Sequence, residues 1–358
     1  MAYLLINIDT EEEGLFGACY PRDDWRLGHL TELPRLQDIF DRFGVRPTYQ
    51  VTTPVVQDRV GSAYLQEYLD AGRCDIGGHL HPWATEPYAE PADAAHSMPC
   101  LLPLDSVRRK LTTLTQQIHD RFGIQPVTYR SGRYGSAAMH TPILLKLGYR
   151  VETSVCPFVS HTEYDGPDYT HAPLEPYWLG EQDMLERQSE GRLLCVPISA
   201  GFNVRHFRLA GRIHEILRRR PYSRLHMIGI LYRLGVLRLI RLNPEMTSLD
   251  DLLRLCRAKV RRGDDLFHLT FHSSNIGIGG TPYVPTPEAR DAFLDRLRGV
   301  LDYLVNTCGI VPVTSREYYE IFTRSVRCAI DEEISAVVTR EDRNNAVNNE
   351  HNCISMES

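Results

Sequence analysis

The stretch Asp75-Ile76-Gly77-Gly78-His79-Leu80-His81-Pro82-Trp83 decides the fold and places the chemistry of this chain. A short apolar run ends in two glycines, two histidines follow with one residue between them, and Pro82 then stops regular structure. Such a strand delivers His79 and His81 to the loop at its carboxyl end, where α/β folds build their sites. Because neutral imidazole is a common zinc ligand, the pair is a candidate metal site. The alternative is a loop with one packed and one solvated histidine.

The composition is that of an ordinary globular protein. The chain has 358 residues, of which 42% are hydrophobic and 24% are charged, so it can form one large α/β domain or two smaller ones. The net charge of -6 does not indicate a nucleic-acid partner. No apolar run is long enough for a transmembrane segment, and the start of the chain shows no basic leader. With nine irregularly spaced cysteines, these features predict a cytoplasmic protein with reduced thiols.

Helical and strand patterns alternate along the chain, outward from the histidine pair. Before it, strands are expected at residues 3–8 and 47–51, and helices at 31–43 and 62–71. After it, helices are expected at 106–122, 141–147, 248–262 and 287–305, and strands at 127–129, 149–152, 193–198, 266–271 and 310–313. This alternation predicts right-handed crossovers and a parallel sheet or barrel.

Residues 205–241 interrupt the alternation. They contain ten arginines and one acidic residue, Glu215. Between the arginines lies an apolar stripe with helical spacing: Ile228, Leu231, Leu234, Leu237 and Ile240. We predict two basic amphipathic helices inserted at about residues 203–243 of a single domain that spans residues 1–330. Their basic face could be merely solvated, or it could hold an anionic part of a substrate, a protein partner or anionic lipid. The polar segment 331–358 is expected to be a disordered tail.

Polar side chains follow four of the predicted strands. Asp9 and Glu11 end the first strand, the histidine pair ends the third, and Arg130 and His272 end two later ones. The carboxyl ends of parallel strands meet at one face of a barrel, so these side chains are expected to share one site. Glu12 and Glu13 also fit the acidic amino end of a helix, but Asp9 lies on the strand itself.

Four short motifs occur in the order found in a known family. They are Ile8-Asp9-Thr10-Glu11, Gly78-His79-Leu80-His81, Arg130-Ser131-Gly132-Arg133-Tyr134-Gly135 and Phe271-His272-Ser273-Ser274. Over most of residues 1–325 the chain resembles the NodB-type polysaccharide deacetylases, carbohydrate esterase family four. The resemblance implies a distorted (β/α)7 barrel and a divalent metal, usually zinc, held by one acid and two histidines. It also implies hydrolysis of N-acetyl or O-acetyl groups on sugars.

The resemblance assigns a metal ligand set to this chain. Glu11 corresponds to the acidic ligand and His79 to the first histidine ligand. The family's second histidine is usually four positions later, where this chain has Trp83, which cannot bind a metal. His81 is therefore the expected substitute.

The resemblance also assigns the catalytic roles. Asp9 corresponds to the general base, Arg130 to the arginine that pairs with it, and His272 to the acid that protonates the leaving amine. Tyr134 corresponds to the residue whose backbone N–H helps to hold the oxyanion. With Tyr134, Arg133 and Trp83 are expected to contact the substrate.

We therefore expect a metal-dependent deacetylase, with zinc as the expected metal. A cytoplasmic location favours a small glycoside or a nucleotide-linked or lipid-linked acetylated sugar over peptidoglycan or chitin. One alternative is hydrolysis of cyclic imides or ureides on the same barrel. Another is a sugar-binding protein without catalysis, if the change at Trp83 has abolished metal binding.

Overall fold

A computed structural model of the chain describes residues 1–17, 19–219, 222–326 and 328. Residues 1–316 form one compact unit, and residues 317–358 form another. In the second unit the described residues up to 326 are helical. The expected single domain over residues 1–330 stays a prediction, and the expected tail at 331–358 lies outside the described residues.

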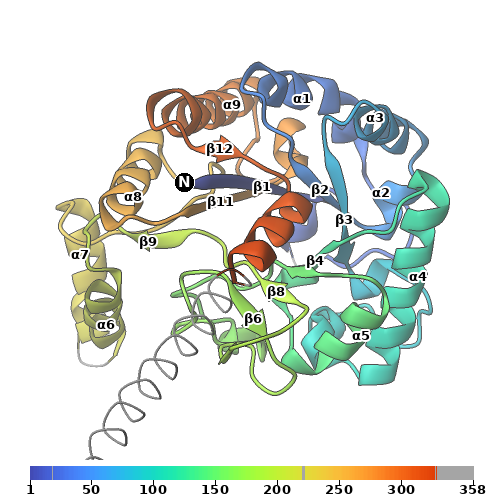
Figure 1. Cartoon of the computed structure of the whole chain (residues 1–358), viewed down its shortest axis with the longest axis horizontal. Helices are drawn as coiled ribbons and strands as arrows, with labels where there is room; N and C mark the ends of the chain where they lie inside the picture. The colour runs from blue at the N-terminus through green and yellow to red at the C-terminus, as the bar shows by residue number, and fades with distance from the viewer. Residues whose placement is uncertain (18, 220–221, 327, 329–358) are drawn as a thin grey trace, which may run out of the picture. The chain divides into compact units, whose positions relative to one another are not determined.

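A curved parallel sheet forms the centre of the first unit (Figure 1). Seven neighbouring strands are parallel, in the spatial order β11 (Leu266–His272), β1 (Tyr3–Thr10), β2 (Thr48–Val51), β3 (Asp75–Leu80), β4 (Thr128–Ser131), β5 (Val151–Glu152) and β8 (Leu194–Cys195). β6 (Tyr177–Leu179) and β7 (Arg187–Gln188) extend the sheet in antiparallel fashion, and β12 (Val311–Pro312) pairs with β1.

Irregular segments bridge the space between β8 and β11. The amide of Ser199 donates to the carbonyl of His268 at 3.1 Å, and the amide of Thr270 donates to the carbonyl of Leu242 at 3.2 Å. The strands thus follow a barrel that is distorted at this point. The predicted (β/α)7 barrel is confirmed.

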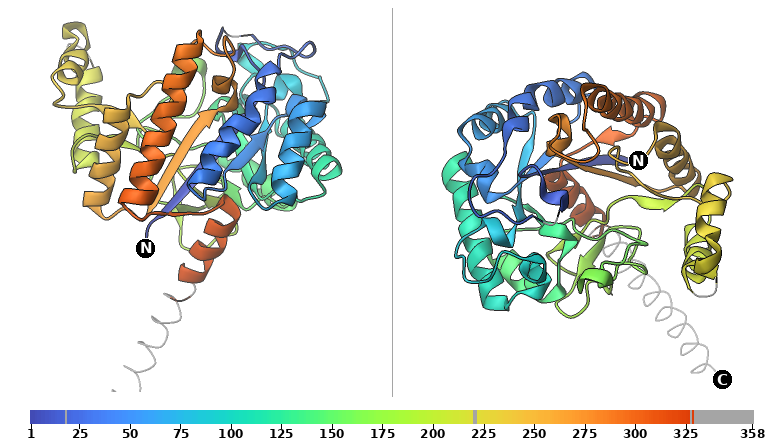
Figure 2. Two further views of the ribbon diagram at one scale, coloured as in Figure 1. Left: turned by 90° about the horizontal axis from the view of Figure 1, so that it is seen from above. Right: turned by 180° about the vertical axis from the view of Figure 1, so that it is seen from behind.

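Helices cover the outside of the sheet (Figures 1 and 2). They are α1 (Leu33–Arg42), α2 (Thr53–Gln57), α3 (Arg59–Asp70), α4 (Leu104–Phe122), α5 (Thr141–Lys146), α8 (Leu249–Arg262) and α9 (Pro287–Leu301). Local sequence explains their ends: Asp58 and Ser248 accept hydrogen bonds from the first turns of α3 and α8. Gly123 and Gly263 end α4 and α8 with positive φ values, which glycine adopts without strain. The expected helix over 287–305 changes at Asp302 to a π-helical turn, Asp302–Thr307.

The arginine-rich insertion contains α6 (Phe207–Arg218) and α7 (Met227–Arg233). The expectation that its apolar stripe continues as helix through Ile240 is wrong. Gly235, with φ of +69°, follows the end of α7, and the chain returns as β10 (Leu239–Arg241), antiparallel to β9 (Ala200–Phe202). Asn203 joins the two ends, since its side chain donates to the carbonyl of Gly235 and accepts from the amide of Arg238.

Candidate metal centre and active site

The strand register brings the predicted residues to one end of the barrel. On the neighbouring strands β1 and β11, Asp9 lies directly beside His272. On β3 and β4, His79 lies directly beside Arg130. Glu11 follows β1, so all these side chains come from carboxyl ends of parallel strands, where the barrel fold places its chemistry.

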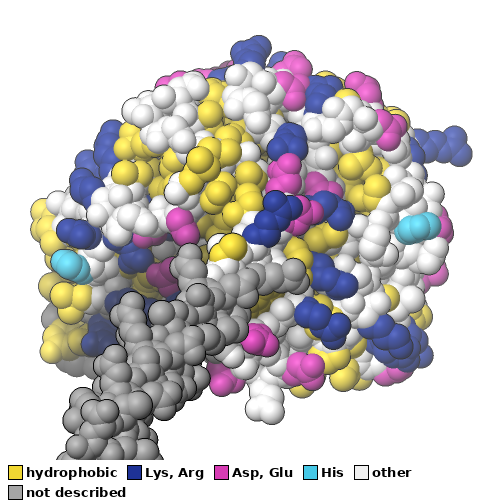
Figure 3. All heavy atoms as spheres, in the orientation of Figure 1, with side chains coloured by type: hydrophobic (Ala, Val, Ile, Leu, Met, Phe, Trp, Pro, Cys, Tyr) yellow, Lys and Arg dark blue, Asp and Glu magenta, His cyan; other side chains and the backbone are white. Residues whose placement is uncertain are grey.

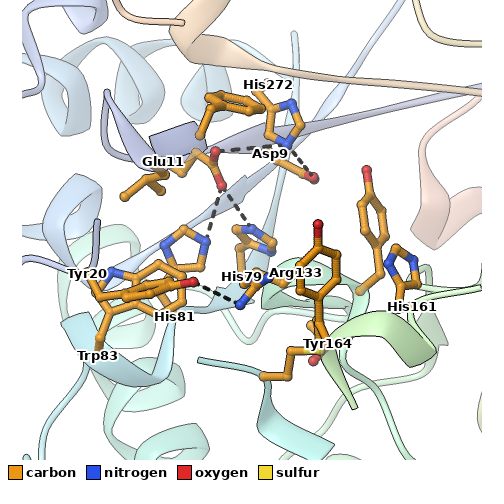
Figure 4. Close-up of a pocket in the computed structure, with 15 residues that line it drawn as sticks. Asp9, Glu11, Tyr20, His79, His81, Trp83, Arg133, His161, Tyr164 and His272 are labelled. Carbon is orange, nitrogen blue, oxygen red and sulfur yellow. Dashed lines mark hydrogen bonds and ion pairs between the residues drawn. The ribbon is translucent and has the colours of Figure 1, made fainter. Parts of the chain in front are cut away.

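Glu11, His79 and His81 form a buried cluster whose potential ligand atoms all lie within 4.8 Å of one another. Oε2 of Glu11 is 3.2 Å from Nε2 of His79 and 3.1 Å from Nε2 of His81 (Figure 4). Two imidazole nitrogens and one carboxylate oxygen are the donor set that a catalytic zinc site uses. The three residues expected as ligands are therefore brought together.

The other nitrogen of each imidazole also has a partner. Nδ1 of His79 lies 3.1 Å from the carbonyl oxygen of Arg130, and Nδ1 of His81 lies 3.2 Å from the carboxylate of Glu12. Thr52 in turn donates to Glu12 at 2.8 Å. A metal-binding histidine usually donates its second N–H in this way, which fixes the ring and turns Nε2 toward the metal. The donor set and its orientation both fit a divalent cation.

The charges within the cluster shift its pKa values in opposite directions. Burial alone would raise the pKa of Glu11, but the charge of His272 and hydrogen bonds from His79 and His81 lower it far below its ordinary range. Burial alone would lower the pKa of His81, but Glu12 and Glu11 reverse this effect and raise it to about 9. Glu11 thus stays charged, as cation binding requires, whereas His81 must release its proton before its nitrogen can bind a cation.

Asp9 and Arg130 form a buried ion pair. Nη1 of Arg130 donates to Oδ1 of Asp9 at 2.8 Å, and the same guanidinium contacts Thr270 and lies 3.4 Å from Nε2 of His268. Arg130 is completely buried and Asp9 is 2% exposed. His268 itself has its pKa lowered to about 3 by burial and by Arg130, so it is a neutral partner deeper in the barrel.

His272 faces Asp9 and Glu11 from the opposite side of the cluster. Its Nε2 lies 3.8 Å from Asp9 and 3.9 Å from Glu11. Nδ1–H donates to Oε1 of Glu245 at 2.7 Å, and that oxygen also accepts from Asn275 at 2.8 Å. Burial lowers the pKa of His272, but Glu245, Glu11 and Asp9 outweigh it and raise the pKa to about 10.

A cavity of about 340 Å³ opens over these residues. Its walls include the aromatic side chains of Phe16, Tyr20, Trp83, Tyr134 and Tyr164 (Figure 4). Trp83 stacks on His81 with the ring centres 4.2 Å apart, so it supports the metal cluster and lines the cavity without replacing a ligand.

Arg133 and Tyr134 belong to the loop after β4. Both have positive φ values, +53° and +59°, in the segment that contains Gly132 and Gly135. Arg133 donates to the hydroxyl of Tyr20 at 2.9 Å and also contacts Ser97. Both residues line the cavity, and both are predicted from the sequence to contact the substrate.

Two residues of the site have no role assigned from the sequence. Glu245 accepts a hydrogen bond from His272, which lies 27 positions later. The sequence alone shows only that Glu245 precedes the helix before β11. Glu12 fits the amino end of a helix by sequence, but this interpretation is wrong. No α-helix begins there: Glu12 lies in irregular chain before the short 3-10 helix Leu15–Gly17, and it is 1% exposed between Thr52 and His81.

Comparisons with known proteins bear on the fold. No family model and no curated protein sequence matches the chain. It is similar in structure to a protein from Mycobacterium smegmatis described as a polysaccharide deacetylase, with 16% identity, a TM-score of 0.53, and 92% of this chain and 91% of that chain covered. It is also similar to a protein from Parabacteroides distasonis described as a glycoside hydrolase/deacetylase, with 13% identity, a TM-score of 0.60, and 90% and 71% covered. The chain therefore has the fold of the NodB-type polysaccharide deacetylases.

Proposed function

We propose that this protein is a metal-dependent hydrolase that removes an acetyl group from an N-acetylated or O-acetylated sugar compound. The observation that carries the proposal is the position of Glu11, His79 and His81 in one cavity with Asp9 and His272. The five residues come from three separate segments of the chain, at the carboxyl ends of β1, β3 and β11. The fold shared with polysaccharide deacetylases supports the same reaction.

Glu11, His79 and His81 would hold the cation, for which zinc is the proposed identity. A divalent cation supplies Lewis-acid stabilisation of charge on the acyl oxygen and makes a water molecule more acidic. Asp9 is the base that accepts the proton of the attacking water, and its ion pair with Arg130 fixes the position of the carboxylate.

His272 acts on the other side of the acyl carbon. An amine leaves poorly as an anion, so a protonated imidazole must donate to its nitrogen. Glu245 accepts the hydrogen bond from Nδ1 of His272, which directs Nε2 toward the cavity. The backbone of Tyr134 is the proposed second donor to the oxyanion.

The proposed substrate is a small acetylated glycoside or a nucleotide-linked or lipid-linked acetylated sugar. Aromatic walls present large apolar surfaces to a ligand, and Arg133 adds a positive charge beside Tyr20. A cytoplasmic location stays a prediction. Within the described residues, no helix is long and apolar enough to cross a membrane.

Metal analysis and acetate release test the proposal together. The purified protein is assayed after zinc loading and after chelation, with acetylated sugars, their O-acetyl counterparts and cyclic imides as substrates. We expect about one ion per chain and acetate release that chelation abolishes. Turnover of cyclic imides alone would favour the alternative hydrolase. A protein that takes up no metal even when it is added would contradict the proposal.

A further inference from the structure

The inserted helices expose an unusual amount of apolar surface. We use the name inserted arm for residues 204–241. Of the nineteen large apolar side chains that are exposed in the described part of the chain, nine lie between Val204 and Val236. A soluble surface rarely carries so many in one short segment unless something covers them.

On α6 the exposed apolar residues share one face. Leu209, Ile213 and Ile216 are 58%, 42% and 52% exposed, and their spacing of four and then three residues places them in one stripe. Arg212 lies three positions after Leu209 and four before Ile216, so its guanidinium borders the stripe. Beyond α6, four more apolar or aromatic residues on and after α7 are exposed: Ile230, Tyr232, Leu234 and Val236.

The arginines around this surface carry charge that the protein itself does not neutralise. Glu215 pairs with Arg219, and Asp251 pairs with Arg238. Seven further described arginines of the inserted arm form no ion pair with any described residue: Arg205, Arg208, Arg212, Arg218, Arg224, Arg233 and Arg241. Figure 3 shows hydrophobic and basic side chains side by side at the edge of the molecule where Figure 1 places α6 and α7.

We propose that the inserted arm binds the surface of an anionic lipid bilayer. A helix that lies in a membrane interface buries an aliphatic face among the acyl chains, while arginines beside that face contact lipid phosphates. The phosphates of a nucleic acid would neutralise the arginines, but a nucleic acid offers no apolar phase in which Leu209, Ile213 and Ile216 could be buried. The same face of a second copy would bring two sets of unpaired arginines together, which repel.

Vesicle co-sedimentation of the full chain tests this inference without reference to catalysis. We expect binding to vesicles of phosphatidylcholine with phosphatidylglycerol, little binding to phosphatidylcholine alone, and release as salt rises. The triple variant Leu209→Ser, Ile213→Ser, Ile216→Ser should lose binding although its fold is intact, because all three side chains are exposed. Its control is Val60→Ser, Leu104→Ser, Val260→Ser, which removes equally exposed side chains from α3, α4 and α8.

A second pair of variants tests how much the arginines contribute to vesicle binding. Arg208→Gln with Arg212→Gln should weaken binding about fivefold for each arginine removed. Arg42→Gln with Arg59→Gln removes the same charge from exposed positions outside the inserted arm and should leave binding unchanged. Equal binding to both kinds of vesicle would overturn the inference. It would also be overturned if the chain bound neither kind of vesicle, or if the triple serine variant abolished a dimer of the chain and left vesicle binding unchanged.

Discussion

Glu245→Gln tests whether Glu245 tunes His272 or merely packs beside it. The substitution keeps the size of the side chain but removes the negative charge of the carboxylate, whose oxygen accepts a hydrogen bond from Nδ1 of His272 at 2.7 Å. Burial lowers the pKa of His272, and Glu245 is the strongest of the three carboxylates that reverse this effect. A hydrogen bond to a charged group contributes about 1.5–3 kcal/mol, and one pKa unit corresponds to about 1.4 kcal/mol. The pKa of His272 should therefore fall by about one to two units.

The sign of the pH effect follows from the proposed role of His272 as a proton donor. Its protonated form is present below its pKa and is lost above it, so a raised pKa keeps the acid available through neutral pH. In Glu245→Gln, the alkaline limb of the profile of kcat/KM against pH should move to lower pH by the same one to two units. Metal content should not change, because Glu245 accepts from His272 and Asn275 and not from a residue of the metal cluster.

The assay combines that pH profile with metal analysis and with NMR of ring-labelled histidine, which reports the His272 pKa without turnover. Glu175→Gln is the matched control, since it removes one carboxylate from an exposed ion pair with Arg187. If the alkaline limb and the His272 resonance stayed where they are in the parent, the electrostatic account of Glu245 would be refuted. Loss of metal would show instead that Glu245 holds the fold of the site.

Three further predictions follow from the same geometry. His79→Ala should lose the metal, whereas His272→Ala should keep it and lose about 10²–10⁴-fold in turnover; equal metal content in both variants would argue against the ligand set. Arg130→Met should lower the free energy of unfolding by about 3–5 kcal/mol because Asp9 is left buried and unpaired, and adding Asp9→Asn should recover part of the loss in urea unfolding. Burial lowers the pKa of His140 to about 4, so its contribution to stability is present above pH 6.5 and is lost as pH falls toward 4, by up to ~3 kcal/mol. In His140→Leu, urea unfolding should show a smaller loss of stability between pH 7 and pH 5, and a loss as large as in the parent would contradict this.

The barrel could be predicted because its strands are local patterns. The apolar run that becomes β1 and the histidine pair at the end of β3 can each be recognised within a few residues of sequence. The contact between Glu245 and His272 could not be predicted in this way, because the two residues are 27 positions apart and a whole helix lies between them. The prediction of a helix through Ile240 in the inserted arm is wrong for a related reason. The apolar spacing of the arm fits a helix, but pairing with β9 decides its conformation, and the partner of Ile240 lies 39 positions earlier, at Gly201.

The ligand change at Trp83 has a structural explanation in strand geometry. Side chains two positions apart on extended chain point to the same face. His79 lies within β3, and His81 just after it has an extended conformation with φ of -97° and ψ of 107°. Both rings therefore face Glu11. A histidine at position 83 would instead lie on the 3-10 turn Pro82–Ala84, where Trp83 now packs on His81. Asp9 and Glu11 repeat the same spacing of two on and after β1, which directs both carboxylates to the cavity. The site is therefore carried by two extended segments rather than by a strand and a helix, and a spacing of two is the one that such segments require.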